Sequence, residues 1–221
     1  MKAGTRPRVK ICCISSVQEA RLAIEYGAAA VGLVSKMPSG PGVIPDELIA
    51  RVAGCVPPAV SSFLLTCEQN VSEIVRQQRG AGVSTIQLCD RLEIGSHEGL
   101  RRALPGVAIV QVVHVAGSES VAEAIAVAPF VNGILLDSGN QQSAIKELGG
   151  TGRTHDWNIS RRIREAVSVP VFLAGGLNAA NVAAAIRQVK PFGVDVCSGV
   201  RTGGKLDEEK LAAFFRSVEN A

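Results

Sequence analysis

The chain has 221 residues, of which 47% are hydrophobic and 19% charged, and its formal net charge at pH 7 is +3. These values are typical of a globular protein with one large core, and they exclude intrinsic disorder. The small net charge, scattered basic residues and 4% aromatic content predict no nucleic-acid partner and no membrane partner. Residues 1–9 lack the apolar region of a signal peptide, so we expect a cytoplasmic protein.

The cysteines and histidines give no sign of a disulfide framework, a metal site or an organic cofactor. No C-x-x-C pair occurs among the six cysteines, which are Cys12, Cys13, Cys55, Cys67, Cys89 and Cys197. The three histidines (His97, His114 and His155) fall on different predicted elements. Only His114, just past the end of a predicted strand, is a histidine worth testing for a role in a site.

Short apolar runs alternate with helical patterns along the whole chain. Their nearly continuous Val, Ile and Leu content predicts parallel strands buried on both faces. We predict strands at 8–13, 30–34, 60–65, 84–88, 107–113, 131–136, 169–174 and 193–197. Helices are predicted at 16–27, 45–54, 69–81, 93–103, 118–127, 156–167, 178–189 and 207–218.

Three polar residues stand where predicted helices begin. Ser16 is placed to cap the first helix, with Glu19 at the reciprocal position of a capping box. Asn178 is the expected cap of the seventh helix, and Asp207 that of the eighth. These starts support the predicted alternation of strands and helices.

Eight strands alternating with eight helices predict an α/β fold, a single (β/α)8 TIM barrel with parallel strands over residues 1–221. The alternative is a doubly wound open sheet. That fold usually carries a glycine fingerprint after its first strand, where this chain has Cys12-Cys13-Ile14-Ser15. The barrel is therefore preferred, with its functional site at the C-terminal ends of the strands.

Two glycine turns follow the last two predicted strands. Such turns leave bare backbone N–H groups at the start of a helix, and many (β/α)8 barrels bind phosphate at this position. A lone Gly-Gly turn often serves only to reverse the chain, but the ordered pair favours a small phosphorylated ligand. The predicted phosphate-binding residues are Gly175, Gly176, Asn178, Ser198, Gly199 and Val200.

The longest predicted connection, 138–154, follows the sixth strand. Its glycine-rich part suits a lid over a site at the mouth of the barrel. The predicted lid residues are Gly149, Gly150, Thr151 and Gly152.

Five motifs, in their order and spacing, carry a family resemblance. They are Val-Lys-Ile-Cys at 9–12, Leu-Leu-Asp at 135–137, Gly-Gly-Thr-Gly-Arg-Thr-His-Asp-Trp at 149–157, Gly-Gly-Leu-Asn at 175–178 and Val-Asp-Val-Cys-Ser-Gly-Val at 194–200. Over essentially its full length the chain resembles phosphoribosylanthranilate isomerase, the (β/α)8 enzyme of tryptophan biosynthesis. That enzyme carries out an Amadori rearrangement of N-(5-phosphoribosyl)anthranilate to the carboxyphenylamino-deoxyribulose phosphate.

The resemblance implies roles for individual residues. Cys12 matches the family's general base and Asp137 its general acid. Asp195, Lys36 and Arg153 are the expected contacts to the substrate, a small phosphorylated sugar derivative. The reaction needs no metal or cofactor, and the enzyme is expected to work as a monomer or a homodimer.

The pleat of the first strand adds two expectations from the residues themselves. Cys12 and Cys13 should point to opposite faces, one into the barrel and one toward the helices. Lys10 shares the face of Cys12, so we expect it inside the barrel and paired with a carboxylate.

The chain departs from the family pattern at four positions, the first of which is Cys13, where the family usually has Gly. Pro41 stands where the family usually has an Arg for the anthranilate carboxylate, and Cys89 where it usually has a His. Arg201 replaces a Glu after the last glycine turn, and Lys36 is the nearest substitute cation for the missing Arg. One alternative is therefore a diverged paralogue that acts on another phosphoribosylamine.

A second alternative is a phosphate-ligand-binding barrel without catalysis. The position of Cys12 discriminates the two classes: a thiol at the mouth of the barrel favours an enzyme, and a thiol packed between strand and helix favours a binder.

Overall fold

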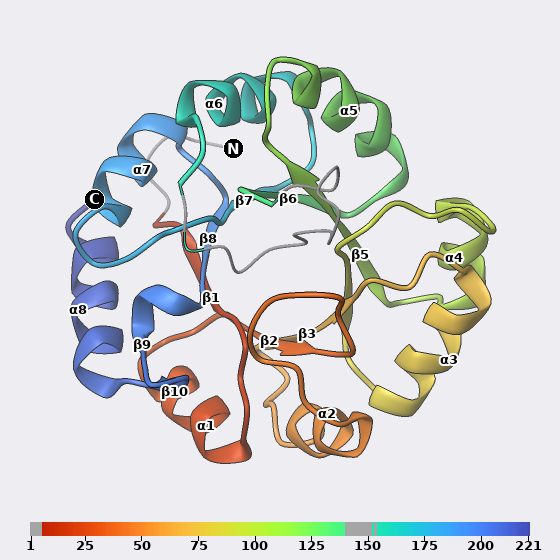
Figure 1. The fold of residues 1–221 in the computed structure, drawn as a ribbon, viewed down its shortest axis with the longest axis horizontal. Helices are drawn as coiled ribbons and strands as arrows, with labels where there is room; N and C mark the ends of the chain where they lie inside the picture. Colours follow the sequence, from red (N-terminus) through yellow and green to blue (C-terminus); the bar gives the residue numbers. More distant parts are fainter. Residues whose placement is uncertain (1–5, 140–151, 153) are drawn as a thin grey trace.

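The computed structural model describes residues 6–139, 152 and 154–221. Eight parallel strands form a closed barrel in which each strand pairs with the next in sequence and β8 pairs with β1 (Figure 1). The strands are β1 (Arg8–Ile11), β2 (Ala30–Val34), β3 (Ser61–Thr66), β4 (Thr85–Leu88), β5 (Ala108–His114), β6 (Gly133–Asp137), β7 (Val171–Leu173) and β8 (Gly193–Val196).

The helices form an outer ring around this barrel (Figure 1). They are α1 (Val17–Glu25), α2 (Asp46–Ala53), α3 (Val71–Ala81), α4 (His97–Ala103), α5 (Glu119–Val127), α6 (Trp157–Ala166), α7 (Val182–Val189) and α8 (Glu208–Glu219). Two short 3₁₀ helices, η1 (Ala128–Phe130) and η2 (Ser198–Val200), precede β6 and follow β8. The predicted (β/α)8 barrel is confirmed.

The apolar residues divide into two cores. The larger core lies between the strands and the helices and contains the fully buried Ile11, Leu33, Ile86 and Phe214. The smaller core fills the barrel and includes Phe63, Leu65 and Phe172 together with Cys12 and Cys13. Side chains on both faces of each strand are therefore buried, which explains the nearly continuous apolar runs.

The first strand ends earlier than its sequence predicts. β1 stops at Ile11, and Cys13 has φ +60°, in the left-handed region that favours glycine. This turn brings Cys12 and Cys13 into the same core inside the barrel. The expectation that they point to opposite faces is wrong, because the period-2 alternation of side chains ends with the strand.

The predicted helix caps are confirmed at two of three positions. The Ser16 hydroxyl accepts a hydrogen bond from the Glu19 N–H at 3.1 Å, and Asp207 accepts from the Lys210 N–H. Asn178 is not the cap of α7: its side chain accepts from the Ala180 N–H, and the helix begins four residues later, at Val182. The amide side chain stabilises the turn instead of the helix.

A two-stranded hairpin after η2 is absent from the sequence predictions. It consists of β9 (Arg201–Thr202) and β10 (Lys205–Leu206), and it lies between α8 and α1 in Figure 1. Among the helices that the structure describes, none is both long and apolar enough to cross a membrane.

Candidate active site

A pocket opens at the C-terminal ends of the strands. Cys12, Asp137 and Asp195 line it, and they follow or end β1, β6 and β8. The glycine turns after β7 and β8 form part of the same wall. Parallel strands in a closed barrel bring residues that are far apart in sequence to one mouth, and this places three titratable groups together.

Lys10 and Asp195 form an ion pair inside the barrel. The Lys10 ammonium lies 2.9 Å from Asp195 Oδ1, and the two side chains are 0% and 7% exposed. Burial alone disfavours the charged ammonium, but the Asp195 carboxylate and the neighbouring Cys12 and Cys13 together raise the pKa of Lys10. The expectation of an interior Lys10 paired with a carboxylate is confirmed.

The Cys12 thiol lies beside this ion pair. A methyl group at Gly32 would come within 3.0 Å of Cys12 Sγ and 3.1 Å of Lys10 Nζ, so both atoms border the same glycine. A hydrogen bond from Cys13, together with the positive charge of Lys10, lowers the pKa of Cys12 against the opposing effect of burial. The Cys12 thiol therefore loses its proton more readily than an ordinary cysteine thiol does.

Cys13 is the partner that favours the Cys12 thiolate. Its Sγ lies 3.7 Å from the Pro41 carbonyl oxygen. Interaction with the neighbouring Cys12 and Cys197 thiols, together with burial, raises the pKa of Cys13, so Cys13 keeps its proton. Of these two adjacent thiols, Cys12 is the one that ionises.

Asp137 is the last residue of β6 and lines the same pocket as Cys12. Its Oδ1 accepts a hydrogen bond from the Ser138 N–H at 2.7 Å. A methyl group at Gly175 would lie 3.2 Å from Asp137 Oδ1 and 3.0 Å from His155 Nδ1. Gly175 therefore leaves room for a carboxyl and an imidazole to approach each other.

His155, to which the sequence analysis gave no site role, does not line the pocket but lies near Asp137 beside Gly175. Its Nε2 lies 2.7 Å from the Ser160 hydroxyl, while its buried Nδ1 has no hydrogen-bond partner among the described residues. Burial lowers the pKa of His155 although Asp137 opposes the shift, so the imidazole is neutral. His114 instead contacts the Cys89 carbonyl at 3.1 Å and does not line the pocket. The signal in sequence was the position of His155 inside the longest motif.

The two glycine turns touch each other. A methyl group at Gly199 would overlap the Leu177 carbonyl oxygen, so glycine is needed there for close packing. Gly175, Gly176 and Ser198 line the pocket. The backbone N–H groups of Gly176 and Ser198 have no acceptor within the described part of the chain. They are donors available to an anion.

The remaining predicted phosphate contacts lie farther back. Asn178 is half-buried and does not line the pocket, because its amide bonds within its own turn. Val200 is fully buried in the outer core.

The wall that follows β2, β3 and β4 has a different character. It is formed by Met37, Pro41, Leu65 and Cys89, and burial raises the pKa of the Cys89 thiol. Lys36 is exposed and does not line the pocket. Among the described pocket-lining residues there is no Lys or Arg.

Most of the predicted lid lies outside the described residues. Gly149, Gly150, Thr151 and the predicted substrate contact Arg153 lie outside the described residues. Gly152 is described: it lines the pocket, and a methyl group there would lie 3.8 Å from the Ser198 hydroxyl. No group of three or more His, Cys, Asp or Glu side chains over 6–139, 152 and 154–221 is arranged to hold a metal ion.

Comparison with known proteins agrees with this geometry. The family profile for N-(5'-phosphoribosyl)anthranilate (PRA) isomerase matches residues 9–217. An N-(5'-phosphoribosyl)anthranilate isomerase 2 from Methanosarcina mazei is 36% identical, over 96% of this chain and 94% of the relative. The corresponding isomerase from Haloferax volcanii is also 36% identical, over 97% and 94% of the two chains.

Solved structures give the same result. Phosphoribosyl anthranilate isomerase from Thermotoga maritima superposes with a TM-score of 0.81 at 29% identity, covering 97% of this chain and all of that one. A phosphoribosyl anthranilate isomerase in complex with reduced 1-(o-carboxyphenylamino)-1-deoxyribulose 5-phosphate has a TM-score of 0.79 at 28% identity, with the same coverage. The chain belongs to the N-(5'-phosphoribosyl)anthranilate isomerase family.

Proposed function

We propose that the chain isomerises N-(5'-phosphoribosyl)anthranilate, an aminoaldose, to the corresponding aminoketose, with Asp137 as general acid and Cys12 as general base. The single observation that carries the proposal is the convergence of a buried carboxyl and an activated thiol on one pocket beside two glycine turns. Two positioned proton transfers are what an Amadori rearrangement requires, and each is worth roughly 10²–10⁴-fold in rate.

The first proton transfer opens the sugar ring. Asp137 donates its proton to the furanose oxygen, and the ring opens to an imine. Both Ser138 contacts, at 2.7 and 3.4 Å, fall on Asp137 Oδ1, so Oδ2 is the oxygen left to carry the proton. Neutral His155 adds no positive charge beside the carboxyl.

The second proton transfer forms the enolamine. The Cys12 thiolate removes the proton from C2′, and the enolamine then tautomerises to the ketone. The Lys10 charge and the Cys13 hydrogen bond favour this thiolate. Asp195 holds the Lys10 ammonium beside Cys12. Asp195 also lines the pocket, where its carboxylate would accept a hydrogen bond from a sugar hydroxyl or from the amine of the substrate.

The phosphate is proposed to lie between the two glycine turns. The N–H groups of Gly176 and Ser198 are donors without a described partner, and η2 begins at Ser198. A phosphate held there fixes the sugar between Cys12 and Asp137. All six cysteines are free thiols, which is typical of a protein in a reducing compartment, and we propose a cytoplasmic location. We also propose that the enzyme works as a monomer or a homodimer.

The test is turnover of freshly prepared phosphoribosylanthranilate, followed by the loss of its fluorescence. We expect turnover by the native chain and losses of about 10²–10⁴-fold in Cys12→Ala and Asp137→Asn. Cys55→Ala is the matched control, because Cys55 is an exposed thiol away from the pocket. Full activity in Cys12→Ala would contradict the assigned base.

A second candidate function follows from the apolar wall. Where the family usually binds anthranilate with an Arg, this chain has Pro41, and Lys36 is exposed. A diverged enzyme would keep the same proton transfers and accept another phosphoribosylamine. No turnover of phosphoribosylanthranilate, combined with a rise in Tm on adding ribose 5-phosphate, would support this alternative.

A further inference from the structure

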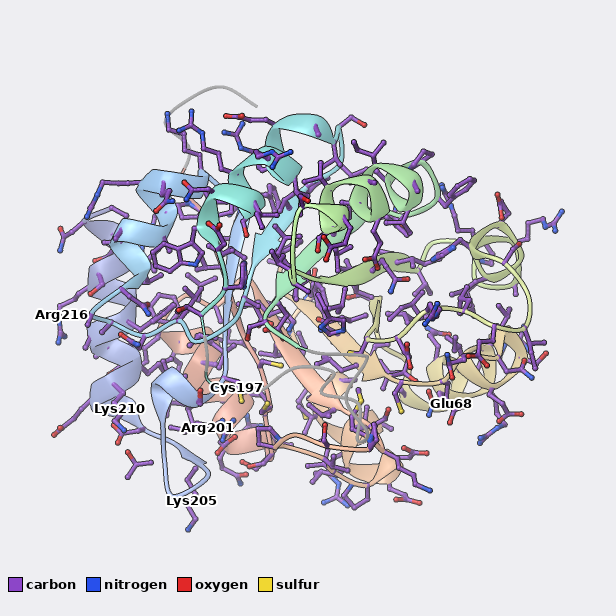
Figure 2. The ribbon with its side chains drawn as sticks, turned by 45° about the horizontal axis from the view of Figure 1, so that its top comes forward. Glu68, Cys197, Arg201, Lys205, Lys210 and Arg216 are labelled. Atoms are coloured by element: carbon purple, nitrogen blue, oxygen red, sulfur yellow. The ribbon has the colours of Figure 1, made fainter. Side chains whose placement is uncertain are left out.

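Arg201 is a buried cation that the proposed proton transfers do not use. It begins β9, directly after η2, and only 9% of its surface is exposed. In Figure 2 it lies close to Cys197, whereas Arg216 lies on the outer surface of α8. Burying a guanidinium is unfavourable unless its donors are satisfied, so its partners indicate what it does.

The guanidinium binds the turn that carries Cys12. Its Nη2 donates a hydrogen bond to the Cys13 carbonyl and a second, at 3.4 Å, to the Cys12 carbonyl. Nη1 donates to the Gly204 carbonyl at 2.8 Å. The planar guanidinium thus joins the turn after β1, which carries Cys12, to the hairpin after β8.

Glu19 completes this arrangement from α1. Its two carboxylate oxygens lie 3.2 and 2.9 Å from Nη1 and Nη2 of Arg201, a bidentate pair. Glu19 also accepts from the N–H groups of Ser15 and Leu206 at 2.9 and 2.8 Å. Burial opposes its charge, but the Arg201 and backbone hydrogen bonds hold the pKa of Glu19 below its usual value.

The turn needs such support because of its backbone. Cys13 has φ +60°, a conformation that costs free energy for any residue with a Cβ. Cys12 is held on its N-terminal side by its own N–H, which donates to the Val196 carbonyl at 2.9 Å. The carbonyls of Cys12 and Cys13 are held on the other side by Arg201. Together these contacts fix the direction of the Cys12 side chain.

We propose that Arg201 is a positioning residue for Cys12: paired with Glu19, it clamps the Cys12–Cys13 peptide in its left-handed turn and aims the Cys12 thiol into the pocket. The inference rests on the proposed function, in which Cys12 is the general base. In this chain the position of the Cys12 thiol depends on Arg201, because residue 13 is a cysteine and not a glycine.

The first test compares Arg201→Gln and Arg201→Lys with the native chain. Arg201→Lys keeps the charge but removes the planar fork. We expect kcat to fall by about tenfold to a hundredfold while KM changes by less than about threefold, because a displaced base affects the transition state more than substrate binding. Arg216→Gln is the control, since it removes an exposed arginine of α8. Native kcat in both Arg201 variants would overturn the proposal.

The second test repeats Arg201→Lys in a Cys13→Gly background. Glycine adopts φ +60° without strain, so the clamp loses most of its purpose. We expect Arg201→Lys to lower kcat by only a few-fold relative to Cys13→Gly alone. An equal loss in both backgrounds would mean that Arg201 merely stabilises the hairpin, and it would overturn the proposal.

The rate of Cys12 alkylation by iodoacetamide, read by mass spectrometry, separates this proposal from the proposed function. This rate needs no turnover and should depend on Arg201 in the native background but not in the Cys13→Gly background. If Cys12→Ala keeps its turnover while that pattern holds, the assigned base is wrong and the clamp stands. An alkylation rate independent of Arg201 in both backgrounds overturns the clamp. Glu19→Gln carries the same comparison should the Arg201 variants not fold.

Discussion

The two sides of the pocket are built on different physical principles. The side at the ends of β1, β6 and β8, the charged side, carries Cys12, Asp137 and Asp195, and the buried Lys10 is paired with Asp195. The opposite side, the apolar side, carries Met37, Pro41, Leu65 and Cys89. Groups that move protons need fixed neighbours, because a buried charge is tolerated only with a partner. The apolar side instead binds by shape, which tolerates change more readily.

This contrast accounts for the departures at Pro41 and Cys89, whereas Arg201 replaces the family's Glu beside the turn that carries Cys12. The proposed acid and base, Asp137 and Cys12, lie on the charged side, whereas Pro41 and Cys89 replace an expected Arg and His on the apolar side. Residues that bind the amine-side group can change with the substrate, but the proton transfers need the same two groups for any phosphoribosylamine. The following experiments change one side at a time.

The largest effect is expected for Asp137→Asn on the charged side. The amide cannot donate an acidic proton to the ring oxygen, so kcat should fall by about 10²–10⁴-fold. Stability should change little, because the amide oxygen can still accept the Ser138 N–H. Stopped-flow fluorescence measures kcat, and thermal melting measures stability. A loss in kcat of less than about threefold would contradict the role of Asp137 as general acid.

Lys10→Met should give the second largest effect, this time on stability. It leaves the buried Asp195 carboxylate without its partner, which costs roughly 3–5 kcal/mol of unfolding free energy. The cost should shrink as the pH falls, because a protonated Asp195 is neutral and cheaper to bury. Urea unfolding at pH 5 and pH 8 measures this, and Lys10→Met/Asp195→Leu should recover part of the loss. A destabilisation that is equal at both pH values would count against an ionised pair.

Pro41→Arg tests the apolar side directly. If phosphoribosylanthranilate is the substrate, a guanidinium there should lower its KM by about tenfold, since a hydrogen bond to a charged group is worth about 1.5–3 kcal/mol. Pro38→Arg is the matched control, because Pro38 belongs to the same loop but does not line the pocket. An unchanged KM in Pro41→Arg would show that this wall does not contact the anthranilate carboxylate.

The smallest effect is expected for Cys13→Ala on the titration of Cys12. The Cys13 hydrogen bond lowers the pKa of Cys12, so the thiolate forms at a lower pH than that of an ordinary cysteine. Removing that donor should move the midpoint of Cys12 alkylation to higher pH, by about one unit or less. Activity at pH 7 should then fall, because less thiolate is present. A midpoint that moves to lower pH would refute the donor role of Cys13.

The sequence predicted much of the pocket because the barrel fold converts chain order into position. Cys12 and Asp137 follow apolar strands, and the C-terminal ends of parallel strands meet at one mouth. The features of the site that the sequence did not predict are contacts between elements far apart in the chain. The approach of His155 to Asp137 depends on how the chain that carries His155 passes Gly175, and the Arg201–Glu19 pair joins residues 182 positions apart. No local pattern in the sequence encodes either contact.

The sequence by itself determined the alternation of strands and helices, the glycine turns and the family, because local periodicity and motifs are properties of neighbouring residues. Only the tertiary structure decided that β1 ends at Ile11, that Cys13 joins Cys12 inside the barrel, and that Lys36 is exposed. Each of these depends on backbone strain, burial and charge pairing in three dimensions. Such terms arise only when segments far apart in the chain come into contact.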